Sequence, residues 1–149
     1  MTAKLKGLRI LSLEDEPETI EGSLSYLELS GHAVTRVESI ERAEEELRGR
    51  AFDLVIVDQR LPRGDRPDYE GGSSLILELK GGGLGELNQS AAFVFVTASQ
   101  AWIQEDEVSA LDGYMGIEVK GGDLSRHLEE KIVRLRDRGQ ANEPPEARS

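Results

Sequence analysis

Cysteine is absent from this chain of 149 residues, and aromatic residues make up only 5% of it. The absence of cysteine excludes disulfides and metal sites built on thiolates. Positive charge is scarce too, because 18 basic residues stand against 29 acidic ones and the formal net charge is −11. General binding to nucleic acid or to an anionic membrane surface needs basic patches. We therefore expect neither a nucleic acid nor a membrane as a partner.

Long apolar runs are also missing. No run reaches the length that crosses a bilayer, and residues 1–6 lack the apolar core of a signal peptide. We expect a soluble, cytoplasmic protein. The length fits one domain, which we expect over residues 1–139, and the polar residues 140–149 are expected to form a disordered tail.

One short apolar run, Leu54 to Val57, is the centre of the sequence pattern. It is continuous and rich in β-branched residues, which is typical of a strand buried on both faces of a parallel sheet. Asp58 follows it at once. Open α/β sheets bind their ligands at the carboxyl ends of such strands, although a single Asp at this point also fits an ordinary turn.

Strand patterns alternate with helix patterns along the whole chain. Apolar residues at helical spacing follow each strand, and Pro17, Ser39 and Asp123 suit the starts of three helices. Five strands alternating with five helices predict an α/β fold with a parallel sheet covered on both faces. The predicted strands are 8–13, 33–37, 54–57, 92–96 and 114–119, and the helices lie near 17–31, 39–47, 73–80, 104–111 and 123–139.

The carboxyl ends of the predicted strands deliver a chemically matched set of side chains to one edge of the sheet. The set is Glu14, Asp15, Asp58, Thr97 and Lys120. Converging carboxylates need a cation or a proton to coexist. Because neither His nor Cys accompanies them, a hard ion such as Mg²⁺ is the expected partner.

These residue types suit phosphoryl transfer to a carboxylate. Asp58 would act as the nucleophile, and Asp15, helped by Glu14, would hold the metal. Lys120 would pair with a phosphoryl oxygen, and Thr97 would donate a hydroxyl hydrogen bond to another. Each residue also has a simpler explanation, such as helix-dipole stabilisation, strand propensity or a surface lysine. The coincidence at four of five strand ends favours the joint interpretation.

The chain resembles the receiver domain of two-component response regulators over about residues 8–138. The matching motifs are Leu13-Glu14-Asp15-Glu16-Pro17, Asp58-Gln59-Arg60-Leu61-Pro62, Thr97-Ala98 and Lys120. The resemblance implies a flavodoxin-like (βα)₅ doubly wound fold with a five-stranded parallel sheet of order 2-1-3-4-5. It also implies a signalling domain rather than an enzyme.

The resemblance also implies a role for each site residue. A histidine kinase or a phosphotransfer protein would phosphorylate Asp58. The expected Mg²⁺ ligands are Glu14, Asp15, Asp58 and the main-chain carbonyl of Arg60. Residues matching Thr97 and Lys120 contact the phosphoryl group in that family. The downstream protein partner is not identified by the sequence.

Four features depart from that family. Gly121 replaces the usual Pro after the lysine, so either a trans peptide bond or a shifted Lys120 is expected there. Ile117 replaces the usual switch aromatic, which leaves two roles open for Trp102, namely acting as the lever or packing against the sheet. Arg60 has three open roles, namely competing with Mg²⁺, contacting the phosphoryl group or reaching solvent. The loop 63–72 is longer than usual, and it would either cover the site or bind a partner.

Three other functions share some of these sequence features. A phosphorylation-independent receiver acting as a protein-binding adaptor is the main alternative, because of Ile117, Gly121 and the long loop. A small hydrolase or phosphatase is disfavoured, since no second acid lies two residues after Asp58. A flavin-binding protein is disfavoured as well, because the turn after the first strand is acidic where a phosphate would bind.

Overall fold

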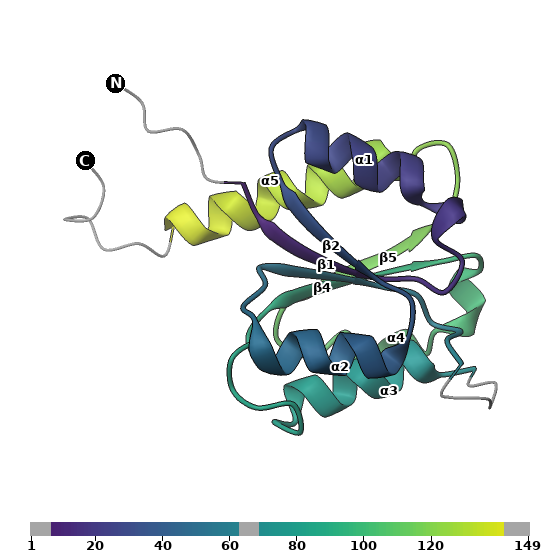
Figure 1. The fold of residues 1–149 in the computed structure, drawn as a ribbon, viewed down its shortest axis with the longest axis vertical. Coiled ribbons are helices and arrows are strands. Elements are labelled where there is room, and N and C mark those ends of the chain that lie inside the picture. The colour runs from purple at the N-terminus through teal and green to yellow at the C-terminus, as the bar shows by residue number, and fades with distance from the viewer. Residues whose placement is uncertain (1–6, 63–68, 142–149) are drawn as a thin grey trace.

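The strands of the computed structural model form one five-stranded parallel sheet of order β2-β1-β3-β4-β5 (Figure 1). The structure describes residues 7–62 and 69–141. Both the fold class and the strand order predicted from the sequence are confirmed. The strands are β1 (Arg9–Leu13), β2 (Ala33–Val37), β3 (Leu54–Val57), β4 (Ala92–Thr97) and β5 (Tyr114–Val119).

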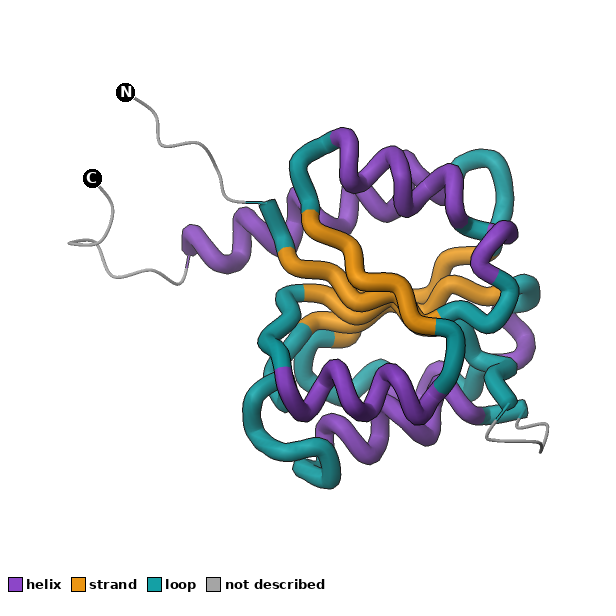
Figure 2. Tube along the Cα trace, viewed as in Figure 1, coloured by secondary structure: helices purple, strands orange, loops and turns teal. Residues whose placement is uncertain are grey.

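Helices cover both faces of this sheet, as Figure 2 shows. α1 and α5 lie together on one face, and α2 and α3 lie on the other (Figure 1). The helices are α1 (Glu21–Leu29), α2 (Ile40–Gly49), α3 (Gly71–Lys80), α4 (Glu105–Val108) and α5 (Leu124–Ala141), with short 3-10 turns η1 (Pro17–Thr19) and η2 (Gln100–Trp102).

Two apolar clusters hold the layers together, one on each face of the sheet. Alternate residues of each strand face opposite sides, so Leu11 and Val55 join the cluster under α2 and α3 while Ile10 and Ile56 join the cluster under α1 and α5. All four residues of β3 are buried. This burial explains why β3 is continuously apolar rather than alternating.

Several helix boundaries differ from the sequence prediction. Pro17 begins a 3-10 turn, and the α-helix starts only at Glu21. α4 has four residues instead of the predicted eight. α5 continues to Ala141, two residues past Gly139. Most of the expected disordered tail, residues 142–149, lies outside the described residues, as does 63–68 of the long loop.

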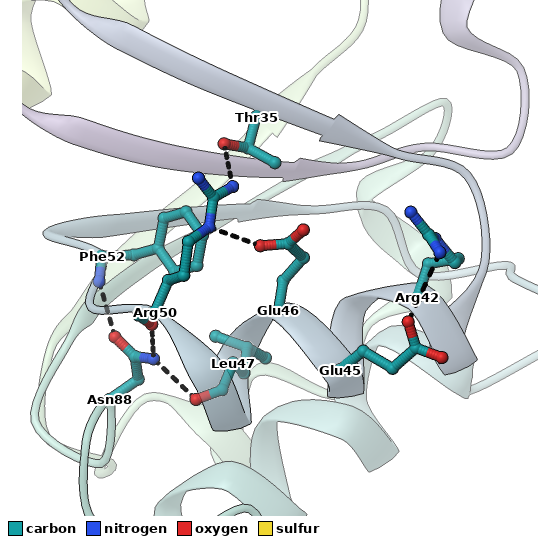
Figure 3. Close-up of polar contacts among 8 residues, drawn as sticks. All are labelled: Thr35, Arg42, Glu45, Glu46, Leu47, Arg50, Phe52 and Asn88. Atoms are coloured by element: carbon teal, nitrogen blue, oxygen red, sulfur yellow. Dashed lines mark hydrogen bonds and ion pairs between the residues drawn. The ribbon is translucent and has the colours of Figure 1, made fainter.

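Asn88 links the connection between α3 and β4 to the end of α2 by hydrogen bonds (Figure 3). Its Nδ2 donates to the carbonyls of Leu47 (2.8 Å) and Arg50 (2.6 Å), and its Oδ1 accepts from the Phe52 N–H (2.7 Å). The carbonyls at the end of a helix have no partner within it. Asn88 therefore fixes the point at which the chain leaves α2 and enters β3.

Among the residues that the structure describes, no helix combines the length and the apolar character needed to span a bilayer.

Candidate functional site

The side chains predicted to form the site come from four strand ends that meet at one edge of the sheet. Glu14 and Asp15 follow β1, Asp58 follows β3, Thr97 ends β4 and Lys120 follows β5. Main-chain hydrogen bonds set their register. The Asp58 N–H donates to the last carbonyl of β1 at 3.1 Å, and the Lys120 N–H donates to the Thr97 carbonyl at 2.9 Å.

The three acids form a compact carboxylate cluster. Glu14, Asp15 and Asp58 each offer an oxygen, and these oxygens lie within 4.8 Å of one another. Glu14 is 3% exposed and Asp58 5% exposed. Buried carboxylates that close together repel each other unless a cation lies between them.

Lys120 supplies one such cation. Its Nζ lies 2.7 Å from Glu14 Oε1 and 3.1 Å from Asp58 Oδ2. The three acids offer oxygen atoms alone, and such a donor set fits a hard divalent ion such as Mg²⁺.

Burial shapes the protonation of this cluster. The pKa of Glu14 is raised to about 7, chiefly by burial and also by the charge of Asp58, although Lys120 and the N–H of Glu16 oppose the shift. For Lys120, burial alone would lower the pKa, but Glu14 and Asp58 outweigh it and the pKa is raised. Lys120 therefore stays charged between the two carboxylates.

Thr97 brings an unpartnered hydroxyl to the same edge. The residue is completely buried, and its Oγ1 has no hydrogen-bond partner. A buried hydroxyl without a partner costs free energy. The Thr97 hydroxyl can therefore donate a hydrogen bond to a ligand atom that reaches it.

A hydrogen bond and close packing fix the backbone around Asp58. Asp58 Oδ1 accepts from the Gln59 N–H at 2.7 Å. The start of α3 packs directly against this turn, because a Cβ added to Gly72 would lie only 2.0 Å from the Asp58 carbonyl oxygen. A glycine at position 72 is therefore required for α3 to begin beside the predicted nucleophile.

The structure also shows where the residues that depart from the receiver pattern lie. The Arg60 guanidinium carbon lies 3.8 Å from the centroid of the Trp102 ring, rather than against the carboxylates. Ile117 is partly buried and packs against the core cluster under α2 and α3. No peptide bond is cis among the described residues, so the predicted trans bond between Lys120 and Gly121 is confirmed. The role of the Arg60 carbonyl as a metal ligand stays a prediction.

Sequence reasoning missed one residue of the site, Gln59. Its side chain is 1% exposed, and it bonds to Ser73 of α3 and to Trp102 of η2. The available signal was a polar residue placed between Asp58 and Leu61, both of which are buried. Polar side chains at such positions need partners inside the protein.

Comparison with known proteins gives matches at the level of structure alone. No protein family model matches the chain, and no curated protein matches it.

Solved structures, in contrast, match over most of the chain. A CheY-like response regulator receiver domain from Methylobacillus flagellatus is 22% identical, with a TM-score of 0.69 over 87% of this chain and 99% of its own. A CheY-like receiver domain protein from Methanospirillum hungatei JF-1 is 20% identical, with a TM-score of 0.69 over 92% of this chain and 100% of its own. A response regulator protein from Thermotoga maritima in complex with Mg²⁺ and BeF is 24% identical, with a TM-score of 0.66 over 86% of this chain and 98% of its own.

These likenesses cover the sheet and both helical layers. The chain therefore has the fold of response regulator receiver domains.

Proposed function

We propose that this chain forms a cytoplasmic receiver domain that accepts a phosphoryl group on Asp58 in a reaction assisted by Mg²⁺. The observation that carries the proposal is the pairing of Lys120 with both Asp58 and Glu14, together with an unpartnered hydroxyl on Thr97 at the end of β4. A lysine, a hydroxyl and a carboxylate at the ends of separate strands can all bond to a phosphoryl group that lies between them.

The chemistry requires little beyond positioning and neutralisation of charge. A carboxylate oxygen of Asp58 attacks the phosphorus of the donor and forms a new P–O bond. The bond from phosphorus to the leaving group breaks, and its electron pair stays with the leaving group, which is an imidazole nitrogen for a phosphohistidine donor. Bound Mg²⁺ would neutralise phosphoryl oxygens, and Glu14, Asp15 and Asp58 would hold it.

The remaining residues stabilise the product. Lys120 would move from Glu14 toward a phosphoryl oxygen, and the Thr97 hydroxyl would donate to another. The expected donor is a histidine kinase or a phosphotransfer protein, and the expected output is a protein contact rather than turnover of a substrate. The Thermotoga maritima neighbour, which was solved with Mg²⁺ and BeF, supports this assignment.

Mass spectrometry tests the proposal. The protein is incubated with Mg²⁺ and acetyl phosphate, for which acetate is the leaving group. The parent chain should gain the mass of one phosphoryl group, and Asp58→Asn should not. Asp53→Asn is the matched control, because Asp53 flanks the opposite end of β3 and should leave the mass gain unchanged. Equal uptake by Asp58→Asn and the parent would overturn the assignment of Asp58.

One observation favours a second candidate, a phosphorylation-independent adaptor. Lys120 pairs with both Glu14 and Asp58, and Ile117 packs against the core cluster where the family has an aromatic switch residue. A chain that takes up phosphate neither from acetyl phosphate nor from a phosphorylated histidine donor would support the adaptor.

A further inference from the structure

Gln59 is the residue after the predicted phosphoacceptor, Asp58. Its side chain joins three segments of the chain by hydrogen bonds. Its Oε1 accepts from both the N–H (2.7 Å) and the hydroxyl (2.9 Å) of Ser73, and its Nε2 donates to the carbonyl of Trp102 (3.2 Å). The loop that carries Trp102 follows Thr97 and β4. Gln59 therefore connects the end of β3, the start of α3 and the loop after β4.

The orientation of the Gln59 amide is fixed by the start of α3. The first N–H groups of a helix have no partner within it, and the residue before α3, Glu70, provides no side-chain cap. Gln59 Oε1 serves as that cap through Ser73, the third residue of the helix. Because the two Ser73 donors occupy the amide oxygen, the amide nitrogen must face Trp102.

Arg60 holds the same loop at a second point. Its guanidinium lies 3.8 Å from the centroid of the Trp102 ring and 5.0 Å from that of the Tyr69 ring. Both distances are within the range of cation–π attraction. The two residues that follow Asp58 therefore hold Trp102 from different sides, one at its carbonyl and one at its ring.

We infer that Gln59 and Arg60 form a two-point latch through which phosphorylation of Asp58 loosens the Trp102 loop, with Gln59 as a positioning residue. This inference rests on the proposed function. A phosphoryl group adds a charge of about −1.5 to −2, at a carboxylate whose oxygen already bonds to the Gln59 N–H. The new anion attracts the Arg60 guanidinium and draws it off the Trp102 ring, so the stack weakens in the phosphorylated state.

The loop is suited to such a change. Trp102 is only partly buried, whereas the next residue, Ile103, is 7% exposed and anchored in the core. η2 has a single turn, which carries little helical stability of its own. Release of the ring thus requires movement of a short segment between Thr97 and a fixed anchor.

Fluorescence of the single tryptophan reports whether the Trp102 ring is still held by the latch. Mass spectrometry of the same sample measures phosphate occupancy. On incubation with Mg²⁺ and acetyl phosphate, the parent should gain phosphate and its Trp102 emission should shift to longer wavelength. Arg60→Lys keeps the charge but loses the planar stack, and Gln59→Met removes the link to the Trp102 carbonyl. When compared with the parent at equal phosphate occupancy, both variants should lose at least half of the emission shift.

Two matched controls separate the latch from general damage. Arg50→Lys alters another arginine over an aromatic ring, Phe52, at 5.5 Å in the opposite part of the sheet, and should retain the full shift. Ser73→Ala removes only the hydroxyl bond to Gln59, and it should also retain the full emission shift. If Gln59→Met fails to fold, Arg60→Lys still decides the matter.

Each combination of results has one meaning. Phosphate uptake without an emission shift in the parent, or with an undiminished shift in Arg60→Lys, would overturn the latch and leave the proposed function standing. A parent chain that takes up no phosphate would overturn both.

Discussion

Under the proposed function, the Thr97 hydroxyl serves ligand binding rather than stability. Its hydroxyl is buried and unpartnered, although valine has nearly the same shape and would avoid the cost. An unsatisfied buried hydroxyl costs about 1–3 kcal/mol. The expected benefit of the hydroxyl therefore appears only when a phosphoryl oxygen accepts its hydrogen bond.

Replacement by valine should separate these two effects. Thr97→Val is expected to keep or raise the free energy of unfolding, by up to about 1 kcal/mol, and to reduce phosphate occupancy with acetyl phosphate. Urea unfolding and mass spectrometry measure the two quantities. Thr35→Val is the matched control, because Thr35 Oγ1 accepts from Arg50 (2.9 Å) and its loss should lower stability by about 0.5–1 kcal/mol. A clear loss of stability in Thr97→Val would contradict this account.

Under the proposed function, Lys120 would compete with a divalent ion for the same carboxylate oxygens. Its Nζ contacts both Glu14 and Asp58. Lys120→Met should therefore tighten Mg²⁺ binding by roughly tenfold, which corresponds to about 1.4 kcal/mol, and should reduce phosphate uptake. The rise in melting temperature with added Mg²⁺ measures the affinity.

A second lysine serves as the control for that prediction. Lys131 pairs with Glu118 at 3.0 Å and donates to the Met115 carbonyl, away from the acid cluster. Lys131→Met should leave Mg²⁺ affinity unchanged. Equal affinities in Lys120→Met and the parent would show that the amine and the ion do not share a position.

Among the elements, the connection between α3 and β4 depends most on a single side chain, that of Asn88. It makes three hydrogen bonds to main-chain groups of α2 and of the segment that leads into β3 (Figure 3). Asn88→Ala should lower the free energy of unfolding by about 2–4 kcal/mol, because buried carbonyls and an N–H lose their partners. Gln89→Ala, next in sequence, removes one bond to the Lys80 carbonyl and should cost about 1 kcal/mol. Denaturant unfolding of both variants checks the difference, and equal losses would refute the role of Asn88.

The sequence was sufficient to predict the elements whose pattern repeats over several residues. β2, β3 and β5 have the predicted boundaries, because runs of β-branched and apolar residues specify them. The meeting of Glu14, Asp58 and Lys120 was equally predictable, since the carboxyl ends of parallel strands share one edge.

The elements that departed from prediction depend on single residues or on contacts between loops. α4 ends at Val108 because the chain turns through Ser109, and Leu111 only packs against the core cluster from outside the helix. β5 carries an irregular register near Gly116, whose φ is +100°. The bonds of Gln59 to two other segments depend on how the loops approach each other, and sequence periodicity carries no information on that.

At the scale of the whole molecule, the pH dependence of stability should include a contribution from His32. Its Nδ1 accepts from the Leu8 N–H at 3.0 Å, so the ring must be neutral at that nitrogen. Burial lowers the pKa of His32, and the charge of Arg136 lowers it further, while Glu129 opposes the shift. The unfolded chain, in which the pKa is about 6.5, therefore binds the proton more readily than the folded chain.

The sign of the effect follows from this difference. The stabilising contribution is complete above about pH 6.5 and decreases as the pH falls, because protons then favour the unfolded state. His32→Asn keeps an acceptor for Leu8 but does not titrate, so the fall in stability from pH 7 to pH 5 should be smaller in that variant. Urea unfolding at several pH values measures it. His127 is present in both chains, so it does not affect the comparison.

The most direct test of the central claim is a crystal structure of the protein with Mg²⁺ and beryllofluoride, which mimics a phosphoryl group. The account predicts beryllofluoride on a carboxylate oxygen of Asp58, Mg²⁺ against Glu14 or Asp15, Lys120 Nζ moved onto a fluorine, and the Thr97 hydroxyl bonded to another. A bare Asp58, with Lys120 still paired to Glu14 at saturating concentrations of both reagents, would contradict it.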